Sequence, residues 1–385
     1  MSFDHGLPQH VGVEEEYFIT DLQSRQMVAE PSIQVLQDCR EALGEGFCFE
    51  MFQGQIEWAS PVFEHLAQAS ECLRQRRQAL DRALDPHGLG FLCAGTHPLA
   101  LWRQQKATPQ AHFQQLFSEY AQVAQRSVLS GLHVHAQVPL GIDRIGVMNE
   151  VLPWLPLLLA LSASSPFWQG HHSGYCSYRQ VACDEWPRMG APEYLRDERA
   201  YRHYRLQMRR MGALRGDTPV WWGIRPSLRY PTLELRLTDA CPCVEDVLTL
   251  AGLYSVMVRH ACLLAEPGQR YTLTHHWLFK ENRCQARRWS TRGRYMMDPE
   301  QPVMDLQQWL ALAQQTFGPT AQALGQEQVF TQAGDLLREG TSAERQLQCF
   351  QAQPAHWEEP LRCRAVVDLL MAQSRGKPPP GVESL

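Results

Sequence analysis

The sequence lacks several features that mark specialised classes of protein. Its 385 residues carry a formal net charge of −5 with a pI near 6.3, so no excess of positive charge indicates a nucleic-acid partner. Residues 1–10 contain neither the basic segment nor the apolar stretch of a signal peptide. We therefore expect a cytoplasmic protein whose partners are small molecules, with no nucleic acid among them.

Long apolar runs and closely paired cysteine motifs are also missing. The longest apolar run, residues 151–163, contains two prolines and is too short to span a bilayer, so we expect a buried helix and no membrane association. The 12 cysteines are scattered, and the closest pair, Cys241 and Cys243, has one residue between its members instead of two. Free thiols in a reducing cytosol are therefore expected, and a structural zinc site is not.

The order of the predicted elements indicates one α+β domain. Hydrophobic residues make up 44% of the chain and charged residues 20%, as in soluble globular proteins. Strand-like segments lie in the first two thirds, and the chain is mostly helical from about residue 270. We predict an antiparallel sheet with helices packed on one face, a single domain over residues 1–376, and a disordered tail over residues 377–385.

Three segments alternate apolar and polar residues, which is the pattern of half-buried strands. They span residues 11–20, 131–138 and 231–239. Because strand side chains alternate between faces, the polar side chains of each segment share one face. These side chains are Glu14 and Glu16, then His133, His135 and Gln137, and finally Glu234 and Arg236.

Carboxylate, imidazole and guanidinium groups at this spacing favour a chemically active sheet face. A carboxylate can hold a hard metal ion, and a guanidinium can hold a phosphate or carboxylate through two hydrogen bonds. The alternative is a solvated face with weak ion pairs, and for residues 231–239 taken alone we favour that alternative. A solvated face usually carries more Lys, Thr and Ser, so the three segments together favour a functional site.

Other segments extend this picture. Residues 47–60 are predicted to form one strand bent at Gly54, with Glu57 on its polar face. A helix after Pro61 ends near residue 84, and the basic cluster at residues 74–77 is assigned to its solvated side. The aromatic-rich, irregular stretch from about residue 165 to 187 is predicted to be a binding loop that carries Arg179.

Eight short motifs occur in one order along the chain. They are Val11-Gly-Val-Glu-Glu-Glu16, Gln55-Ile-Glu57, Ala94-Gly-Thr-His-Pro98, Gly131-Leu-His-Val-His135, Ser164-Ser-Pro-Phe-Trp168, Ile224-Arg-Pro226, Leu233-Glu-Leu-Arg236 and Glu281-Asn-Arg283. Through them residues 10–295 resemble the type 2 glutamate–cysteine ligase family, in particular its bacterial carboxylate–amine ligase branch. The chain departs from the family at Gly223, where an acidic residue is usual, and at Ser130 and Ala136.

The resemblance implies a fold and a reaction. The family is similar to glutamine synthetase, with a curved antiparallel sheet whose concave face binds ATP, divalent metals and an amino acid. Its ATP- and Mg²⁺-dependent reaction, with Mn²⁺ as an alternative metal, converts a carboxylate to an acyl phosphate from which an amine displaces phosphate. The resemblance implies glutamate as the carboxylate, cysteine as the first candidate amine, and a homodimer. The identity of the amine substrate stays open, because no residue pattern identifies a pocket for a thiol.

The matching motifs assign roles to individual residues, and Arg179 is a candidate from its place in the predicted binding loop. The predicted metal ligands are Glu14, Glu16, Glu57 and Glu234. The predicted catalytic residues are Arg236, His133 and Arg225, and the predicted nucleotide contacts are His135, Arg236 and Arg283. The predicted substrate contacts are Thr96, His97, Arg179 and Arg225. The alternatives are structural ion pairs for Arg225 and Arg236, a solvated helix face for Arg283, and hydrogen bonds within the polar face for the histidines.

Two other functions remain open from the residues. His133 and His135 with a glutamate could hold zinc in a metal-dependent hydrolase, and stoichiometric zinc in the purified protein would favour it. A non-catalytic protein could keep the same site and sense nucleotide or amino acid, and binding without turnover would favour that reading.

Overall fold

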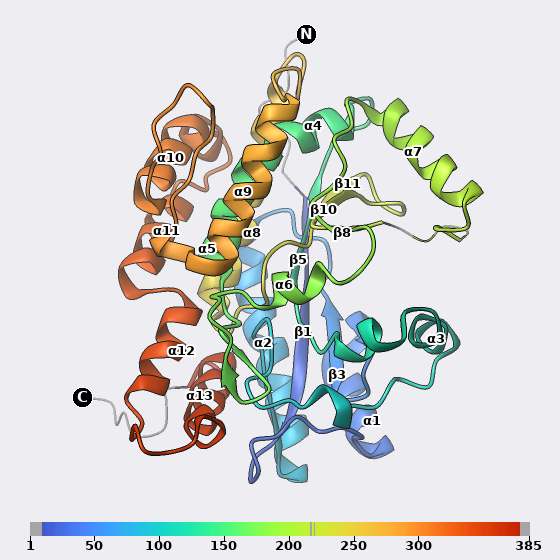
Figure 1. The fold of residues 1–385 in the computed structure, drawn as a ribbon, viewed down its shortest axis with the longest axis vertical. Coiled ribbons are helices and arrows are strands. Elements are labelled where there is room, and N and C mark those ends of the chain that lie inside the picture. Colours follow the sequence, from blue (N-terminus) through green and yellow to red (C-terminus); the bar gives the residue numbers. More distant parts are fainter. Residues whose placement is uncertain (1–9, 216–217, 219, 378–385) are drawn as a thin grey trace.

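A seven-stranded antiparallel sheet lies at the centre of the computed structural model, which describes residues 10–215, 218 and 220–377 (Figure 1). Its order is β10-β11-β5-β1-β3-β2, and β4 pairs with β1 off this path. The strands are β1 (Val11–Asp21), β2 (Phe47–Phe49), β3 (Gln55–Ala59), β4 (Leu89–Leu92), β5 (Leu132–Gln137), β10 (Ile224–Pro226) and β11 (Thr232–Leu235). Short pairs join β6 (Phe167–Trp168) to β7 (His171–His172) and β8 (Met189–Gly190) to β9 (Trp221–Trp222). The predicted tail, apart from Lys377, lies outside the described residues.

Helices make up most of the remaining chain. The α-helices are α1 (Ile33–Leu43), α2 (Leu66–Leu84), α3 (Ala111–Arg126), α4 (Arg144–Val151), α5 (Leu155–Ser162), α6 (Arg179–Cys183), α7 (Glu198–Arg210), α8 (Val244–Leu263), α9 (Leu273–Trp289), α10 (Leu306–Ala323), α11 (Gln328–Glu339), α12 (Ser342–Gln351) and α13 (Glu359–Ser374). Short 3₁₀ turns lie at Gly44–Gly46, Asp85–His87, Trp102–Gln104, Leu152–Trp154 and Ser290–Arg292.

β1 is the central strand because it is paired along both edges. Val11–Glu15 pair with β5, and Glu14–Phe18 pair with β3. Val13 and Tyr17 are buried in the main core, whereas the intervening Glu14 and Glu16 lie on the other face. The predicted alternation is confirmed in β1, β5 and β11, although β11 is shorter than the predicted segment.

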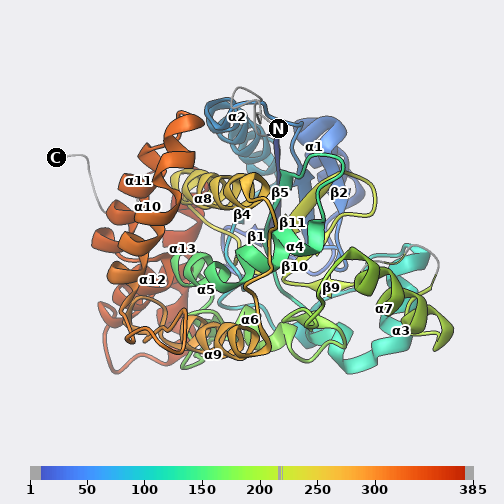
Figure 2. The ribbon, with the colours of Figure 1, turned by 90° about the horizontal axis from the view of Figure 1, so that it is seen from above.

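Helices cover the apolar face of the sheet. In Figure 2, α2 and α8 lie on one side of the central strands, and α3 and α6 lie toward the other. The stretch Arg144–Ser162 is long and apolar enough to cross a membrane by length and composition, with a mean hydropathy of 1.5, but 89% of that window is buried inside the protein. We interpret it as the core helix expected from the sequence.

A second, smaller core closes one end of the opposite face. There Phe18 of β1 clusters with Leu92 of β4 and with Val366 and Leu370 of α13. Because Phe18 shares its face with the preceding even-numbered residues of β1, this apolar cluster confines the polar groups to the other end of the strand.

Residues 47–60 do not form the predicted single bent strand. They form a hairpin in which β2 pairs with β3, with Cys48 opposite Glu57. Gly54 lies in the connecting turn, where an added Cβ would lie 1.9 Å from the carbonyl oxygen of Val28. A close approach of two backbones therefore requires this glycine.

Arg77 is buried, so its assignment to the solvated side of α2 was wrong. Its guanidinium, 2% exposed, donates to the Glu15 carboxylate at 2.5 and 3.2 Å and to the carbonyl oxygens of Cys241 and Pro242. The Tyr17 hydroxyl donates to the same carboxylate at 2.7 Å. The ion pair thus ties α2 to the middle of β1 and to the segment that follows β11.

Replacing Arg77 with methionine should destabilise the protein strongly, because Glu15 would keep a buried charge without its partner. Removing one member of a buried ion pair costs about 3–5 kcal/mol, whereas an exposed pair contributes under about 1 kcal/mol. Arg74→Met in the same helix is the matched control, because the pair of Arg74 with Glu245 is largely exposed. Urea unfolding of both variants measures the difference, and equal losses of stability would contradict this role for Arg77.

Candidate active site

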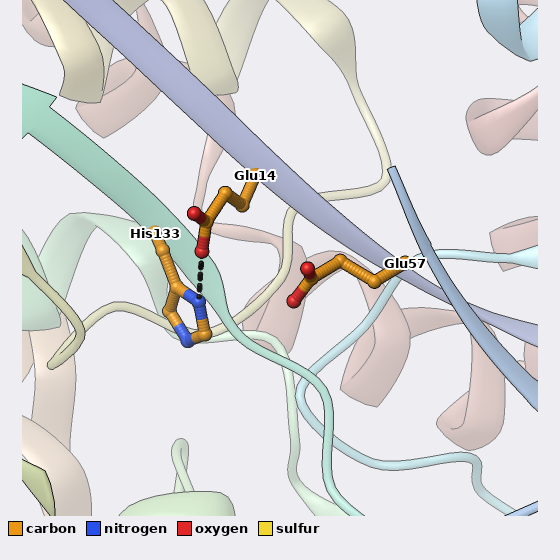
Figure 3. Close-up of side chains that lie close together, drawn as sticks. All are labelled: Glu14, Glu57 and His133. Carbon is orange, nitrogen blue, oxygen red and sulfur yellow. Dashed lines mark hydrogen bonds and ion pairs between the residues drawn. The ribbon is translucent and has the colours of Figure 1, made fainter. Parts of the chain in front are cut away.

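Polar side chains of neighbouring strands meet on one face through the register of the sheet. Glu14 of β1 lies opposite His133 of β5, and Glu234 of β11 lies opposite His135. Opposed residues in antiparallel strands have Cβ atoms about 4.5–5.5 Å apart, so these groups interact directly. Figure 3 shows Glu14, His133 and Glu57 pointing toward one another from three strands.

Three groups on this face have the composition of cation sites. In each group, one ligand atom per residue lies within 4.8 Å of the others. The groups are Glu14, Glu57 and His133; Glu14, His135 and Glu234; and Glu16, Glu50 and Glu57. Oxygen-rich sets of this kind favour Mg²⁺ or Mn²⁺ over softer metals. The structure therefore brings the four predicted metal ligands together and places both predicted histidines beside them.

Glu50 belongs to this site but was missing from the predicted set. Since Cys48 lies opposite Glu57 in the hairpin, Glu50, two residues further along, reaches the same face. In a single strand over residues 47–60, the side chains of Glu50 and Glu57 would point to opposite faces of the sheet. The single-strand interpretation therefore left Glu50 out of the predicted site. The useful signal was Gly54, because a glycine between two short alternating runs also fits a hairpin turn.

Glu14 is held in its ionised form by two histidines. His133 Nδ1 lies 3.1 Å from one carboxylate oxygen, and His135 Nε2 lies 3.2 Å from the other. Burial alone would raise the pKa of Glu14, but hydrogen bonds and charge from these histidines lower it below its ordinary value. Burial, together with the charge of Arg236, lowers the pKa of His133 to about 4, and its buried Nε2 has no hydrogen-bond partner in the described structure. A neutral imidazole with an unused nitrogen fits a metal ligand.

Glu16, Glu50 and Glu57 are three neighbouring carboxyl groups that the nearby arginines do not hold in the ionised form. Burial, and then repulsion from Glu50, raises the pKa of Glu16 to about 8 and that of Glu57 well above its usual range. Burial also raises the pKa of Glu50. Glu16 accepts a hydrogen bond from the Gly131 amide at 2.7 Å, which lowers its pKa by less than burial raises it. A divalent cation among these carboxylates would replace the protons, so the residues present fit such an ion.

Glu234 is balanced by two arginines. Arg225 donates to its two oxygens at 2.7 and 2.9 Å, and Arg236 donates at 2.6 Å. Burial alone would raise the pKa of Glu234, but the charges of Arg236 and Arg225 lower it to about 2. Arg225 therefore forms the structural ion pair that was its alternative role, and Arg236 both pairs with Glu234 and lines the cavity described next.

Two cavities adjoin these charged groups. The first, of about 150 Å³, is lined by Glu16, Glu50, Arg179 and Arg236, and its apolar wall includes Met51, Leu116, Leu129, Trp186, Met189 and Trp221. The second, of about 400 Å³, is lined by Glu14, His135, Tyr230, Pro231 and Val62, among others. The edge of the His135 ring faces the Tyr230 ring, with centroids 6.2 Å apart. The charged groups thus lie between a cavity with two arginines and a larger, mostly apolar one.

Arg179 lines the first cavity, but from the short helix α6 instead of an irregular loop. It donates to the carbonyl oxygens of Arg236 at 3.3 Å and Thr238 at 3.1 Å, and lies 3.9 Å from an Asp239 carboxylate oxygen. Only 6% of Arg179 is exposed, and its Nε has no hydrogen-bond partner in the described structure. A buried cation of this kind is suited to hold a substrate carboxylate.

Thr96 and His97 do not line either cavity. Thr96 donates its hydroxyl hydrogen to the carbonyl oxygen of Phe167 at 2.7 Å. The His97 ring packs edge-on against Phe18, with centroids 5.8 Å apart, and burial lowers its pKa to about 3. Both residues therefore hold the chain after β4 against the second core, which argues against their predicted contact with substrate.

Arg283 also lies outside both cavity linings. Its guanidinium donates to Asp184 at 2.6 Å and to the Gln180 side chain at 3.0 Å, and Arg287 pairs with the same aspartate. Arg283 is buried, so it does not belong to a solvated helix face, and its predicted contact with the nucleotide stays a prediction. It fixes α6, and with it Arg179, against α9.

The chain is similar to one family along nearly its whole length. The model of the family described as glutamate-cysteine ligase family 2 matches residues 10–368. A protein of Pseudomonas fluorescens named "Putative glutamate--cysteine ligase 2" is 67% identical over 378 residues, covering 98% of each chain. A relative of the same name in Pseudomonas putida is 46% identical over 342 residues, covering 89% of this chain and 92% of its own.

Two solved structures share the fold at low sequence identity. A glutamate–cysteine ligase from Francisella tularensis, solved in complex with AMP, matches with a TM-score of 0.69 at 13% identity, covering 98% of this chain and 91% of its own. A bifunctional glutathione synthetase from Pasteurella multocida matches with a TM-score of 0.71 at 13% identity, covering 96% of this chain and 53% of its own. The predicted α+β, glutamine synthetase-like fold is confirmed.

Divalent-cation binding should depend on pH, because Glu16 holds a proton below about pH 8 in the metal-free protein. Affinity for Mg²⁺ should rise as pH increases from 6 and level off once Glu16 is ionised, with proton release at neutral pH. Calorimetry in two buffers of different ionisation enthalpy measures that release.

Glu50→Gln removes both a ligand and a repulsive charge, so it should weaken Mg²⁺ binding and shift the pH dependence to lower pH. Glu41→Gln, at an exposed position, is the matched control and should change neither. Affinity that does not vary with pH in the unsubstituted protein would contradict a buried carboxylate site.

Proposed function

The chain belongs to glutamate-cysteine ligase family 2, and from this membership and the geometry of the sheet face we propose that it joins glutamate to an amine using ATP. Membership makes it an ATP-dependent ligase of the carboxylate–amine type. The observation that carries the finer proposal is the set of buried carboxylates beside Arg236 and Arg179, which suits phosphoryl transfer to a carboxylate.

We assign the second cavity to the nucleotide. Its volume and its apolar wall at Tyr230 and Pro231 suit a purine base, and Glu14 and His135 at its edge lie where the phosphates would meet a cation. Glu14, Glu57 and His133 are the proposed ligands of one Mg²⁺ or Mn²⁺, and Glu16 and Glu50 of a second. A cation held by these residues would help to neutralise the charge that develops on the transferred group.

We assign the first cavity to the amino-acid substrate. Arg179 would hold one substrate carboxylate, which leaves the other free to face the cation cluster and Arg236. An oxygen of that second carboxylate attacks the γ-phosphorus as the bond to ADP breaks, and an acyl phosphate results. Glu234 raises the pKa of Arg236 above its ordinary value although burial opposes this, so Arg236 stays cationic and can neutralise the phosphoryl oxygens.

The amine completes the reaction. Its nitrogen attacks the acyl carbon, the carbon–oxygen bond to phosphate breaks, and the amide forms. The departing phosphate can take up the proton that the attacking amine loses. Cysteine is the first candidate amine, since the related proteins carry that name.

The hydrolase alternative is not supported. His133 and His135 both hydrogen-bond to Glu14, within a cluster made mostly of carboxylate groups. This arrangement differs from a catalytic zinc site, which has three protein ligands and an open position. Family membership favours catalysis by ligation over the sensing role.

We also propose a cytoplasmic homodimer. All 12 cysteines are free thiols, which supports a reducing compartment. Exposed apolar side chains on α9, including Leu273 and Trp277, offer surface that a second copy could cover. Light scattering of the purified protein tests the dimer.

Release of ADP from MgATP tests the proposed reaction. Turnover should require both glutamate and an amine, and a panel of amines that includes cysteine identifies the acceptor. Glu234→Gln should abolish turnover, because Arg225 and Arg236 would lose their shared anchor, and it controls for contaminating ATPases. Failure to bind MgATP would rule out the proposal, and binding without turnover of any pair would favour the sensing role.

Arg236→Gln should lower kcat by about 100- to 1,000-fold, the loss typical of removing one group that stabilises developing negative charge. The KM for ATP should change far less, because cations carry most of the ground-state phosphate binding. Arg202→Gln on the exposed side of α7 is the control and should leave both constants unchanged. A variant with wild-type kcat would place Arg236 outside the chemistry.

A further inference from the structure

A cavity of about 560 Å³ lies apart from the two cavities of the sheet face. It is bounded by the end of α9, the 3₁₀ turn Ser290–Arg292, α12 and the segment just before α6. Its lining includes His172, Tyr175, Cys176, Arg288, Trp289, Arg292 and Glu344. It shares no lining residue with either of the others, so the proposed reaction does not account for it.

Two guanidinium groups give this cavity a positive character. In the described part of the chain, neither Arg288 nor Arg292 lies within ion-pair distance of a carboxylate. Arg288 is positioned by two rings, 5.7 Å from the Tyr175 centroid and 4.9 Å from that of Trp289. Arg292 lies beside the buried Cys176 thiol, whose pKa burial raises and Arg292 lowers. Both cations are therefore oriented by the protein without being neutralised by it.

The one carboxylate in the lining, that of Glu344, already accepts hydrogen bonds from neighbouring protein groups. Glu344 accepts hydrogen bonds from the Thr341 amide at 2.8 Å, from the Thr341 hydroxyl at 3.2 Å and from the Thr291 hydroxyl. The bonds from Thr341 to one oxygen belong to the capping box at the start of α12, and the Thr291 hydroxyl donates to the other oxygen, so both oxygens already accept hydrogen bonds. The cavity therefore retains an excess of positive charge.

We propose that this cavity binds a small anionic metabolite bearing carboxylate or phosphate groups, and that its occupancy is coupled to the substrate cavity. Arg288 and Arg292 supply the charge-assisted hydrogen bonds, and the exposed part of Trp289 supplies a flat apolar wall for the rest of the ligand.

Short covalent and hydrogen-bonded connections link this cavity to Arg179. The Cys176 and Ser177 amides donate to the carbonyl oxygen of Arg287 at 3.0 and 2.8 Å. The Ser177 hydroxyl donates to Asp239 at 2.9 Å, and Arg179 begins α6 two residues later. Arg287 also pairs with the aspartate that follows α6. A ligand that moves Arg288 or Cys176 therefore acts on both ends of the helix that carries Arg179.

Inorganic phosphate and succinate are the two probes, measured by calorimetry in EDTA so that no cation bridges them to the carboxylate cluster. At least one probe should bind, and Arg288→Gln with Arg292→Gln should weaken it by at least about tenfold, as expected for loss of two charge-assisted hydrogen bonds. Arg236→Gln should leave this binding unchanged, because Arg236 lines the other cavity. Arg294→Gln, an exposed neighbour outside the lining, is the matched control.

Preference for phosphate or for succinate identifies the anionic group that the ligand carries. No binding by either probe at millimolar concentration, or equal binding by the double variant, would overturn the site, and neither result depends on the proposed ligase activity. The coupling does rest on that activity: the bound probe should change KM for the carboxylate substrate in the unsubstituted protein but not in the double variant. An unchanged KM with the cavity filled would overturn the coupling.

Discussion

Three consecutive glutamates on the central strand have different surroundings. Glu15 faces the apolar core and has Arg77, which is anchored in turn by backbone carbonyl groups. Glu14 faces the opposite side and has two histidines from β5. Glu16 has a single backbone amide and a carboxylate directly across the sheet. Glu15 and Glu14 therefore have side-chain partners that stabilise the ionised carboxylate, whereas Glu16 would be stabilised in that form by the cation of the proposed function.

Charge therefore changes character across the sheet. Toward β11 and β10, Glu234 is matched by two arginines and its pKa falls to about 2. Toward β3 and β2, burial raises the pKa values of two further carboxyl groups, Glu50 and Glu57, and no arginine among the described residues forms an ion pair with either. A polyphosphate placed across this gradient meets fixed cations on one side and carboxylates that require metal on the other. Under the proposed function, that asymmetry would orient the nucleotide through its phosphates.

The sequence predicted the parts of this arrangement that depend on local periodicity. Apolar and polar residues alternate along the strands that carry Glu14, His133 and Glu234, because one face of each strand is buried. This alternation can be read from the sequence. The errors involve partners that are distant along the chain. The amphipathic pattern of α2 cannot show that Arg77 meets Glu15, 62 residues away, and α9 cannot show that Arg283 meets Asp184, 99 residues away. Glu50 was missed because pairing β2 with β3, not the pattern within either, sets its face.

The shape of the substrate cavity depends on segments that the motifs do not cover. Gly223 lines that cavity, and its amide donates to the carbonyl oxygen of Gly190 at 2.7 Å. A Cβ on Gly223 would lie 2.9 Å from a Leu237 methyl carbon, so the acidic residue usual in the family would not fit without a shift of the core. Gly223, Arg179 and Arg236 line the same cavity, so a glycine at this position adds no negative charge beside the two arginines, which under the proposed function would hold an anionic substrate.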